Sequence, residues 1–367
     1  MKKNKVSALY IHIPFCESIC DYCDFTKLQY FRNFAFLYLE KLEQELDSTI
    51  QNKELETIYV GGGTPTSLED DLFLKLLQMI SPYSKKVKEY TFECNPESLT
   101  LNKIKMLKEY GVNRISIGVE STDNRILKSI NRHHTFEDVK KVVTLLKDNG
   151  INNINLDLII GLPNVSGAML DKDIKNILSL KPNHISCYSL TVHEHTVFYI
   201  NKIEEPSEEF AYDAYKKINN LLEQSGYLHY EVSNWCLPNY QSQHNLTYWR
   251  NEEYYGIGLG ASGYIGSTRY KNTTNLSEYL NGKNKKEVEI VDSNYLFFTQ
   301  VMLNLRTSEG LDLVKFNSIF NKDLYKEKKE IIDSYINGGY LFIKDKRLIA
   351  TFEGMMILDK ITLDLTE

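Results

Sequence analysis

The chain has 367 residues, of which 42% are hydrophobic and 25% charged, with a formal net charge of -6 at pH 7. This is the make-up of an ordinary globular protein, long enough for one large and one smaller domain. The negative charge argues against general nucleic-acid binding, which needs a basic surface to neutralise phosphates. Lys2, Lys3 and Lys5 resemble the start of a signal peptide, but no apolar core follows them, and no run of about 18 apolar residues is present. We therefore expect a cytoplasmic protein without a membrane span.

Six short runs rich in β-branched or aromatic residues predict strands, at 8–13, 57–60, 89–93, 114–118, 154–159 and 184–190. The segments between them show the helical spacing of apolar residues, at 34–50, 71–80, 101–110, 136–149 and 169–180. Six strands alternating with helices predict a parallel sheet, either open and doubly wound or curled into a partial barrel.

Polar and glycine-rich segments follow the ends of these predicted strands. Three cysteines follow the first strand, and the next strands lead into 61–65, 93–96, 118–121 and 157–163. In parallel folds the chemistry gathers at the C-terminal ends of the strands. We therefore expect these segments to face one mouth.

Beyond residue 190 the alternation of strands and helices weakens. A predicted helix at 207–224 leads to a motif-rich stretch at 230–263, and the lysine-rich segment 281–287 is typical of a linker. Predicted helices at 293–305, 313–320 and 324–336 then precede short strands at 340–343 and 347–350, an order typical of a winged-helix-like module. We expect a barrel at 1–230, a barrel extension at 231–285 and a C-terminal domain at 286–367.

The spacing of Cys16, Cys20 and Cys23 places three thiolates on one tight loop, which suits iron–sulfur or zinc. A structural zinc site needs four ligands, and neither His12 in the preceding strand nor Phe25 offers a good fourth one. On a four-iron cluster, three protein ligands leave one iron open to a cofactor. The pattern favours a [4Fe–4S] cluster, and a zinc knuckle or simple packing is the alternative. Cys94, Cys187 and Cys236 stand singly, as core cysteines or residues behind a site do.

The sequence resembles the radical SAM proteins related to oxygen-independent coproporphyrinogen III oxidase, and above all their heme-chaperone branch. The matching segments keep their order along the chain, at 10–25, 61–65, 93–96, 113–121, 131–132, 157–163, 230–234, 244–249 and 306–310. The resemblance implies an α/β fold, a partial (β/α)6 TIM-like barrel with a smaller C-terminal winged-helix-like α+β domain. It also implies a [4Fe–4S] cluster and S-adenosylmethionine bound at the C-terminal ends of the strands.

Carried over by position, the resemblance also implies a set of residues that contact S-adenosylmethionine. They are Tyr10, Tyr22, Gly63, Thr64, Glu93, Glu120, Arg132, Asp157 and Thr191. A zwitterionic ligand needs both carboxylates and a guanidinium, which this set supplies. Glu120 departs from the pattern, because many relatives carry glutamine there.

Two functions from different classes fit this resemblance. One is a chaperone that binds heme and delivers it to acceptor apo-proteins, including respiratory proteins at a membrane; the other is the oxidative decarboxylation of coproporphyrinogen III. Phe25, where the oxidase branch usually has a fourth cysteine, favours the chaperone, as does the short segment ahead of Cys16. The sequence leaves open whether S-adenosylmethionine is cleaved and whether the protein forms a homodimer.

The run from His244 to Trp249 resembles the HNxxYW signature of the heme chaperones. A histidine can ligate heme iron, and aromatic rings can stack on the macrocycle. His244 is therefore a candidate heme ligand, although it can equally be a hydrogen-bonded residue of a packed segment. The other candidates are His133, His134, His193 and His195.

Overall fold

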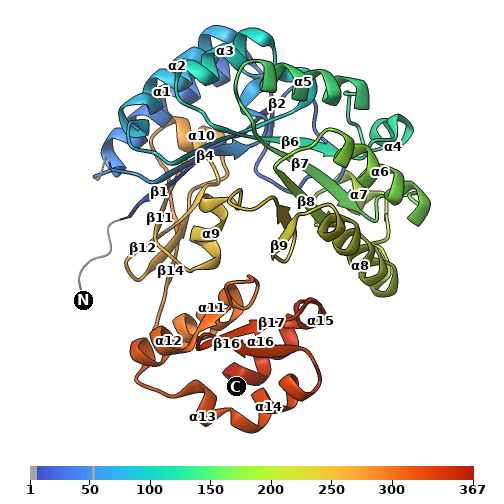
Figure 1. Ribbon diagram of the computed structural model, residues 1–367. Helices are drawn as coiled ribbons and strands as arrows, with labels where there is room; N and C mark the ends of the chain where they lie inside the picture. The colour runs from blue at the N-terminus through green and yellow to red at the C-terminus, as the bar shows by residue number, and fades with distance from the viewer. Residues whose placement is uncertain (1–5, 52–53) are drawn as a thin grey trace.

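The computed structural model describes residues 6–51 and 54–367, so the three N-terminal lysines lie outside the described residues. Six parallel strands lie side by side in chain order, and they confirm the six predicted ones: β1 (Ala8–Ile13), β4 (Thr57–Gly62), β5 (Glu89–Cys94), β6 (Arg114–Glu120), β7 (Asn153–Ile160) and β8 (His184–Ser189). Helices cover their outer face: α1 (Arg32–Thr49), α2 (Asp70–Ser84), α3 (Leu101–Glu109), α5 (Phe136–Asp148), α6 (Gly167–Ser179) and α8 (Glu208–Gln224) (Figure 1). This is the expected partial (β/α)6 barrel.

The two faces of the barrel strands differ in chemistry. On β6, Ile115 and Ile117 belong to the large hydrophobic core with the helices, whereas Arg114 and Ser116 alternate with them and line an inner cavity. Because side chains of a strand alternate between its faces, the barrel has an apolar outer layer and a polar interior. The polar interior positions the candidate site.

Further strands extend the sheet at both edges. β11 (Tyr254–Ile257) pairs with β1 and continues into β12 (Ser262–Ile265), β13 (Thr268–Lys271) and β14 (Glu287–Ile290), while β10 (Asn234–Cys236) and β9 (Leu228–Glu231) continue the sheet beyond β8. The expected domain boundary after residue 230 falls inside β9. The expected boundary after residue 285 comes just before β14, which pairs with β13 in the sheet of the barrel.

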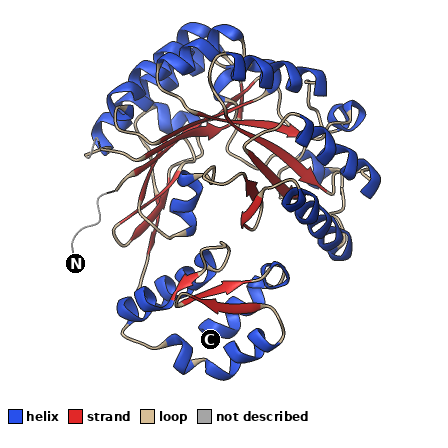
Figure 2. Ribbon diagram, in the orientation of Figure 1, coloured by secondary structure: helices blue, strands red, loops and turns tan. Residues whose placement is uncertain are grey.

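The C-terminal part has its own small sheet and core, drawn below the barrel in Figures 1 and 2. Three antiparallel strands, β15 (Leu311–Asp312), β17 (Arg347–Ala350) and β16 (Leu341–Lys344), pack with α11 (Ser293–Asn304), α12 (Leu313–Phe320), α13 (Leu324–Glu327), α14 (Lys329–Asn337), α15 (Phe352–Met355) and α16 (Leu358–Thr366). The winged-helix-like α+β module is as expected, except that the single helix predicted at 324–336 is broken at Lys328.

The helix α9 (Gln243–Trp249) lies between the two parts of the molecule. The carbonyl of Trp249 accepts a hydrogen bond from Asn304 at 2.8 Å, and Arg250 forms an ion pair with Glu309. In the described part of the chain, no helix is both long enough and apolar enough to cross a membrane.

Candidate functional site

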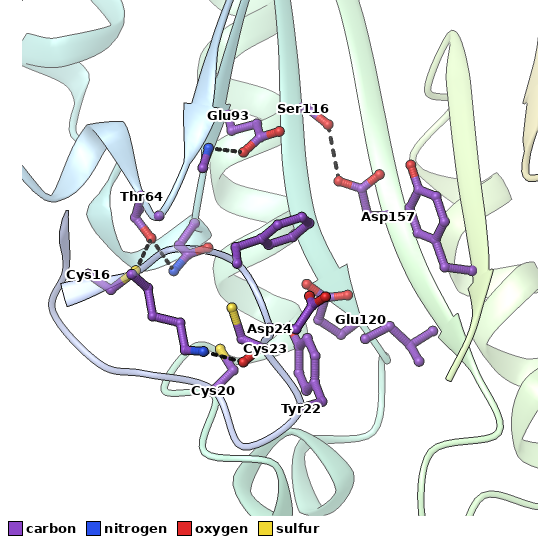
Figure 3. A pocket seen from close by; sticks show the side chains of 18 of the residues that line it. Cys16, Cys20, Tyr22, Cys23, Asp24, Thr64, Glu93, Ser116, Glu120 and Asp157 are labelled. Atoms are coloured by element: carbon purple, nitrogen blue, oxygen red, sulfur yellow. Dashed lines mark hydrogen bonds between the residues drawn. The ribbon is translucent and has the colours of Figure 1, made fainter. Parts of the chain in front are cut away.

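A cavity of about 360 Å³ opens at the C-terminal ends of the barrel strands. It is lined by most of the predicted site residues, namely Cys16, Cys20, Tyr22, Cys23, Gly63, Thr64, Glu93, Glu120, Arg132, Asp157 and Thr191. Figure 3 shows the three cysteines on one side of this cavity and Glu93, Glu120 and Asp157 on the other. Its volume lies within the range of small-molecule sites, which is about 300–1,000 Å³.

The cysteine loop is held at both ends by backbone pairing. Cys16 ends the short strand β2 (Phe15–Cys16), which pairs with β3 (Leu28–Gln29) on the far side of the loop. Cys23 N–H donates to the carbonyl of Cys20 at 3.2 Å, so the second half of the loop is a tight turn. These bonds fix where the three sulfurs lie before any cofactor binds.

His12 supports this loop from below. Its Nε2 donates to the carbonyl of Thr26 at 2.7 Å, and its Nδ1 accepts from the hydroxyl of Tyr10 at 2.9 Å. Burial lowers the pKa of His12 to about 4, so the ring is neutral. Both nitrogens are occupied, and His12 acts as a tether of the loop rather than as a fourth ligand.

The Cys16 and Cys23 thiols favour the protonated form unless a cation binds them. Burial raises the pKa of Cys16, and it raises the pKa of Cys23 to about 12. A bound metal centre reverses this preference, since thiolates are the ligating form. Among the described residues, no three His, Cys, Asp or Glu side chains lie close enough together to hold a single metal ion. The three cysteines nevertheless line the same cavity, and thiolates are the ligands that iron–sulfur clusters take.

Gly63 and Thr64 bring the end of β4 against the cysteine loop. A Cβ atom on Gly63 would lie 2.7 Å from the carbonyl carbon of Pro14, so only glycine allows this approach. The hydroxyl of Thr64 donates to the sulfur of Cys16 at 3.7 Å and accepts from Asn95 at 3.2 Å. Polar backbone and hydroxyl groups thus border the cysteines directly.

Arg132 is a buried guanidinium at the centre of the site. It donates to Asn95 Oδ1 at 3.0 Å and to the sulfur of Cys20 at 3.6 Å, and it faces Glu120 at 3.6 Å. Burial disfavours its charge, but Tyr22, Glu120 and Cys20 outweigh that cost and raise its pKa. Its Nε is buried without a partner. Arg132 therefore has a donor left for an anionic ligand.

Glu120 lies at a β-bulge in β6, with a φ of 64°. Burial raises its pKa to about 7, against the opposing effect of Arg132 and with the help of Asp157. Near neutral pH a fraction of Glu120 carries a proton. The protonated Glu120 can donate a hydrogen bond, as the amide of the glutamine found at this position in many relatives would.

Glu93 and Asp157 complete the opposite wall. Glu93 accepts from Tyr59 at 2.6 Å and from the backbone N–H of Gly62 at 2.9 Å, and Asp157 accepts from Ser116 at 3.0 Å and from Asn155 at 2.7 Å. Burial raises the pKa of both carboxyls. They are held in place and can bind amino or hydroxyl groups of a ligand.

Two predicted site residues do not line the cavity. Tyr10 lies beside it on β1 and uses its hydroxyl for His12. His244 is fully buried, with Nδ1 at 2.9 Å from the Thr57 hydroxyl and Nε2 at 2.8 Å from the Tyr248 hydroxyl. Its position as a heme ligand is not supported by this geometry, because both ring nitrogens are occupied. The geometry agrees with the other possibility, that His244 is a hydrogen-bonded residue of a packed segment. The neighbouring Asn245 does line the cavity.

Several lining residues were not named as site candidates from the sequence, although Asn95 lies in the segment 93–96 expected at the mouth. They are Tyr59, Asn95, Arg114, Ser116, Asn155, Ser186 and Tyr188. All but Asn95 belong to the barrel strands, and the register brings Ser116 next to Asn155 and Asp157 next to Ser186. The signal was present as polar residues at every second position of the strands, which is typical of a polar barrel interior.

The comparisons with known proteins agree with this architecture. Residues 10–177 match the family model described as the Radical SAM superfamily. The chain is 39% identical to the heme chaperone HemW of Lactococcus lactis subsp. lactis (strain IL1403), over 95% of this chain and 94% of that protein. It is 35% identical to the HemW of Bacillus subtilis (strain 168), over 96% of this chain and 97% of that protein.

Among solved structures, the coproporphyrinogen III oxidase HemN of Escherichia coli superposes with a TM-score of 0.83 at 22% identity, over 98% of this chain and 90% of that one. That likeness concerns the fold. The barrel with its three-cysteine loop is of the radical SAM class. Within that class, the chain belongs to the HemW family.

Proposed function

We propose that this chain holds a [4Fe–4S] cluster on Cys16, Cys20 and Cys23, binds S-adenosylmethionine beside it, and carries heme to acceptor proteins. The heme function rests on one observation, the likeness over nearly the whole chain to proteins named heme chaperone. A cytoplasmic location, where thiols stay reduced, goes with this proposal. Respiratory acceptors at a membrane and a homodimer remain predictions from the resemblance.

The geometry of the cavity supports the two cofactors. Three thiols converge on one end of it, and the unpartnered Nε of Arg132 and the carboxyls of Glu93, Glu120 and Asp157 lie around the rest. When bound, such a cluster supplies single electrons and leaves one iron free for a ligand. The residues of this chain then hold the amino, carboxylate and ribose groups of S-adenosylmethionine.

The oxidase remains the weaker alternative. The likeness to the Escherichia coli oxidase stands at 22% identity and concerns the fold. We therefore propose the chaperone.

Cluster binding is tested by anaerobic reconstitution and analysis of iron and sulfide. The wild type should hold about four irons per chain, as one [4Fe–4S] cluster requires. Most of that iron should be lost in each of the variants Cys16→Ser, Cys20→Ser and Cys23→Ser. Cys187→Ser is the matched control, because Cys187 is buried on the opposite strand face, in the core. Equal iron loss in the control and in the three variants would contradict the assignment.

The heme function is tested with the reconstituted protein. Titration with heme, followed by the Soret absorption, should saturate at about one heme per chain. An apo-cytochrome should then acquire heme faster from the heme-loaded protein than from free heme in solution. Absence of saturable binding would overturn the chaperone proposal, and the conversion of coproporphyrinogen III would become the reaction to assay.

A further inference from the structure

We propose that His193, at the mouth of the barrel, is the axial ligand of the heme that this protein carries. This inference rests on the proposed heme function and assigns the site at which the iron porphyrin binds. The chain has eight histidines, and all of them lie in the described residues. They can therefore be sorted by the accessibility of their ring nitrogens.

Five histidines are held inside the protein. They are His12, His134, His184, His229 and His244. His184 is bonded through both nitrogens, to Asn155 at 2.6 Å and to Tyr230 at 2.7 Å, in the same way as His12 and His244. His134 Nε2 is bonded to a backbone carbonyl, and its Nδ1 faces Glu97 at 3.5 Å. His229 stacks on Trp235 at 4.4 Å between centroids and bonds to the carbonyl of Val232. Iron could reach these rings only after repacking.

Three histidines are exposed, namely His133, His193 and His195. Of these, His193 lines the cavity, and the other two do not. The segment that carries it follows β8 and lies against the cysteine loop, because the backbone N–H of Phe198 donates to the carbonyl of Asp21 at 3.0 Å. A heme on His193 would therefore lie at the mouth of the cavity, near the proposed cluster.

Asp24 faces His193 across this mouth. Its Oδ2 lies 3.4 Å from His193 Nε2, and both side chains are partly exposed. Histidines that bind metals commonly donate their second ring N–H to a carboxylate, which orients the ring and makes it a stronger ligand. The pair leaves the other ring nitrogen for iron. The contact is thus of the kind that prepares a ligand, and neither His133 nor His195 has a carboxylate partner of this kind among the described ion pairs.

The rim around His193 is apolar and exposed. Phe25, next to Asp24, is 65% exposed, and Tyr188 on β8 is 43% exposed, and both line the same cavity. Leu190 and Ile159 lie behind them in the lining. Exposed aromatic rings at a cavity mouth indicate an apolar ligand, and a porphyrin presents a broad aromatic face. The rim therefore offers a stacking surface beside the candidate ligand.

The test compares His193→Ala with His195→Ala, in the full chain with its cluster reconstituted. Both residues are exposed and lie two positions apart, so loss of folding is not expected in either variant. His193→Ala should weaken heme binding at least about tenfold and change the Soret band and the ligand-field signature in EPR, whereas His195→Ala should bind like the wild type. Imidazole added to His193→Gly should restore the wild-type spectrum, which a merely structural effect would not do.

The outcomes separate this inference from the proposed function. If the wild type binds heme and His193→Ala binds it with the same affinity and spectrum, the ligand assignment is overturned and the chaperone function stands. If His195→Ala and His193→Ala lose binding equally and imidazole restores neither, the assignment is overturned as well. If the wild type binds no heme, the proposed function fails first.

Discussion

His244 and His193 lie at opposite ends of the barrel strands and differ in almost every physical respect. His244, in the HNxxYW segment, contacts Thr57 at the first residue of β4, and its environment is fully buried. His193 lies beyond the last residue of β8, exposed, and lines the cavity. His244, which belongs to a recognisable motif, lies at the N-terminal ends of the barrel strands, whereas His193, which belongs to none, lies at the C-terminal ends. Within this signature Asn245, and not His244, lines the cavity.

The largest expected effect is on the stability contributed by His244. His244→Ala removes the partner of the buried Thr57 hydroxyl and of the partly buried Tyr248 hydroxyl, and it leaves a void. The free energy of unfolding should therefore fall by about 3 kcal/mol. His193→Ala should change it by less than about 0.5 kcal/mol, because the side chain is exposed. Urea denaturation of both variants without cofactors measures the difference. If the two variants had equal free energies of unfolding, the contacts of His244 in α9 would not contribute to stability.

Glu120 is intermediate between these two histidines, because its side chain is largely but not fully buried and it lines the cavity, as His193 does. Its pKa in the folded protein is raised to about 7 from the ordinary 4.5. Between those values the folded state holds a proton that the unfolded state has lost, so stability falls as pH rises from about 4.5 to 7. The loss is at most about 3.5 kcal/mol, since one pKa unit corresponds to about 1.4 kcal/mol.

Glu120→Gln should remove this part of the pH dependence. Denaturation of the wild type and the variant without cofactors at pH 5 and pH 8 gives the difference directly, and titrations common to both proteins cancel. Parallel pH profiles would show that Glu120 stays ionised in the folded protein.

A substitution at Glu89 tests how the N-terminus of α9, which carries His244, is held in place. This buried carboxylate accepts from the backbone N–H groups of Gln243 at 2.8 Å and His244 at 2.9 Å, and from Ser242 at 3.2 Å. In Glu89→Gln the amide has one acceptor oxygen in place of two, so we expect a loss of about 2 kcal/mol in the free energy of unfolding. Lys88→Ala, at an exposed ion pair on the preceding residue, is the control and should be nearly silent. A silent Glu89→Gln would mean that α9 is anchored elsewhere.

The sequence predicted the fold and the cysteine loop well because both depend on local patterns. Strands β1 and β17 and helix α12 were predicted with their observed ends, and most other predicted elements lie within a few positions of the observed ones. Strands β9 to β14 and helices α9, α15 and α16 were not predicted. Arg114, Ser186 and Tyr188 were missed because the alternation of polar residues marks one face of each strand but does not show which of them line the cavity. That depends on the register between strands. For His244 the sequence left a ligand and a hydrogen-bonded residue equally open, since its partners Thr57 and Glu89 lie more than a hundred residues away in the chain.

The smallest expected effect concerns the link from α9 to the C-terminal domain. Arg250 Nε donates to Glu309 at 3.0 Å and its Nη2 donates to the second oxygen at 2.5 Å, but more than a third of each side chain is exposed. Solvent screens such a pair, so Arg250→Ala should cost about 1 kcal/mol or less, and high salt should reduce the wild-type advantage. A double-mutant cycle with Glu309→Ala isolates the coupling. If Arg250→Ala also weakened heme binding, the C-terminal domain would act on the barrel mouth through α9, and the two ends of the barrel would not be independent.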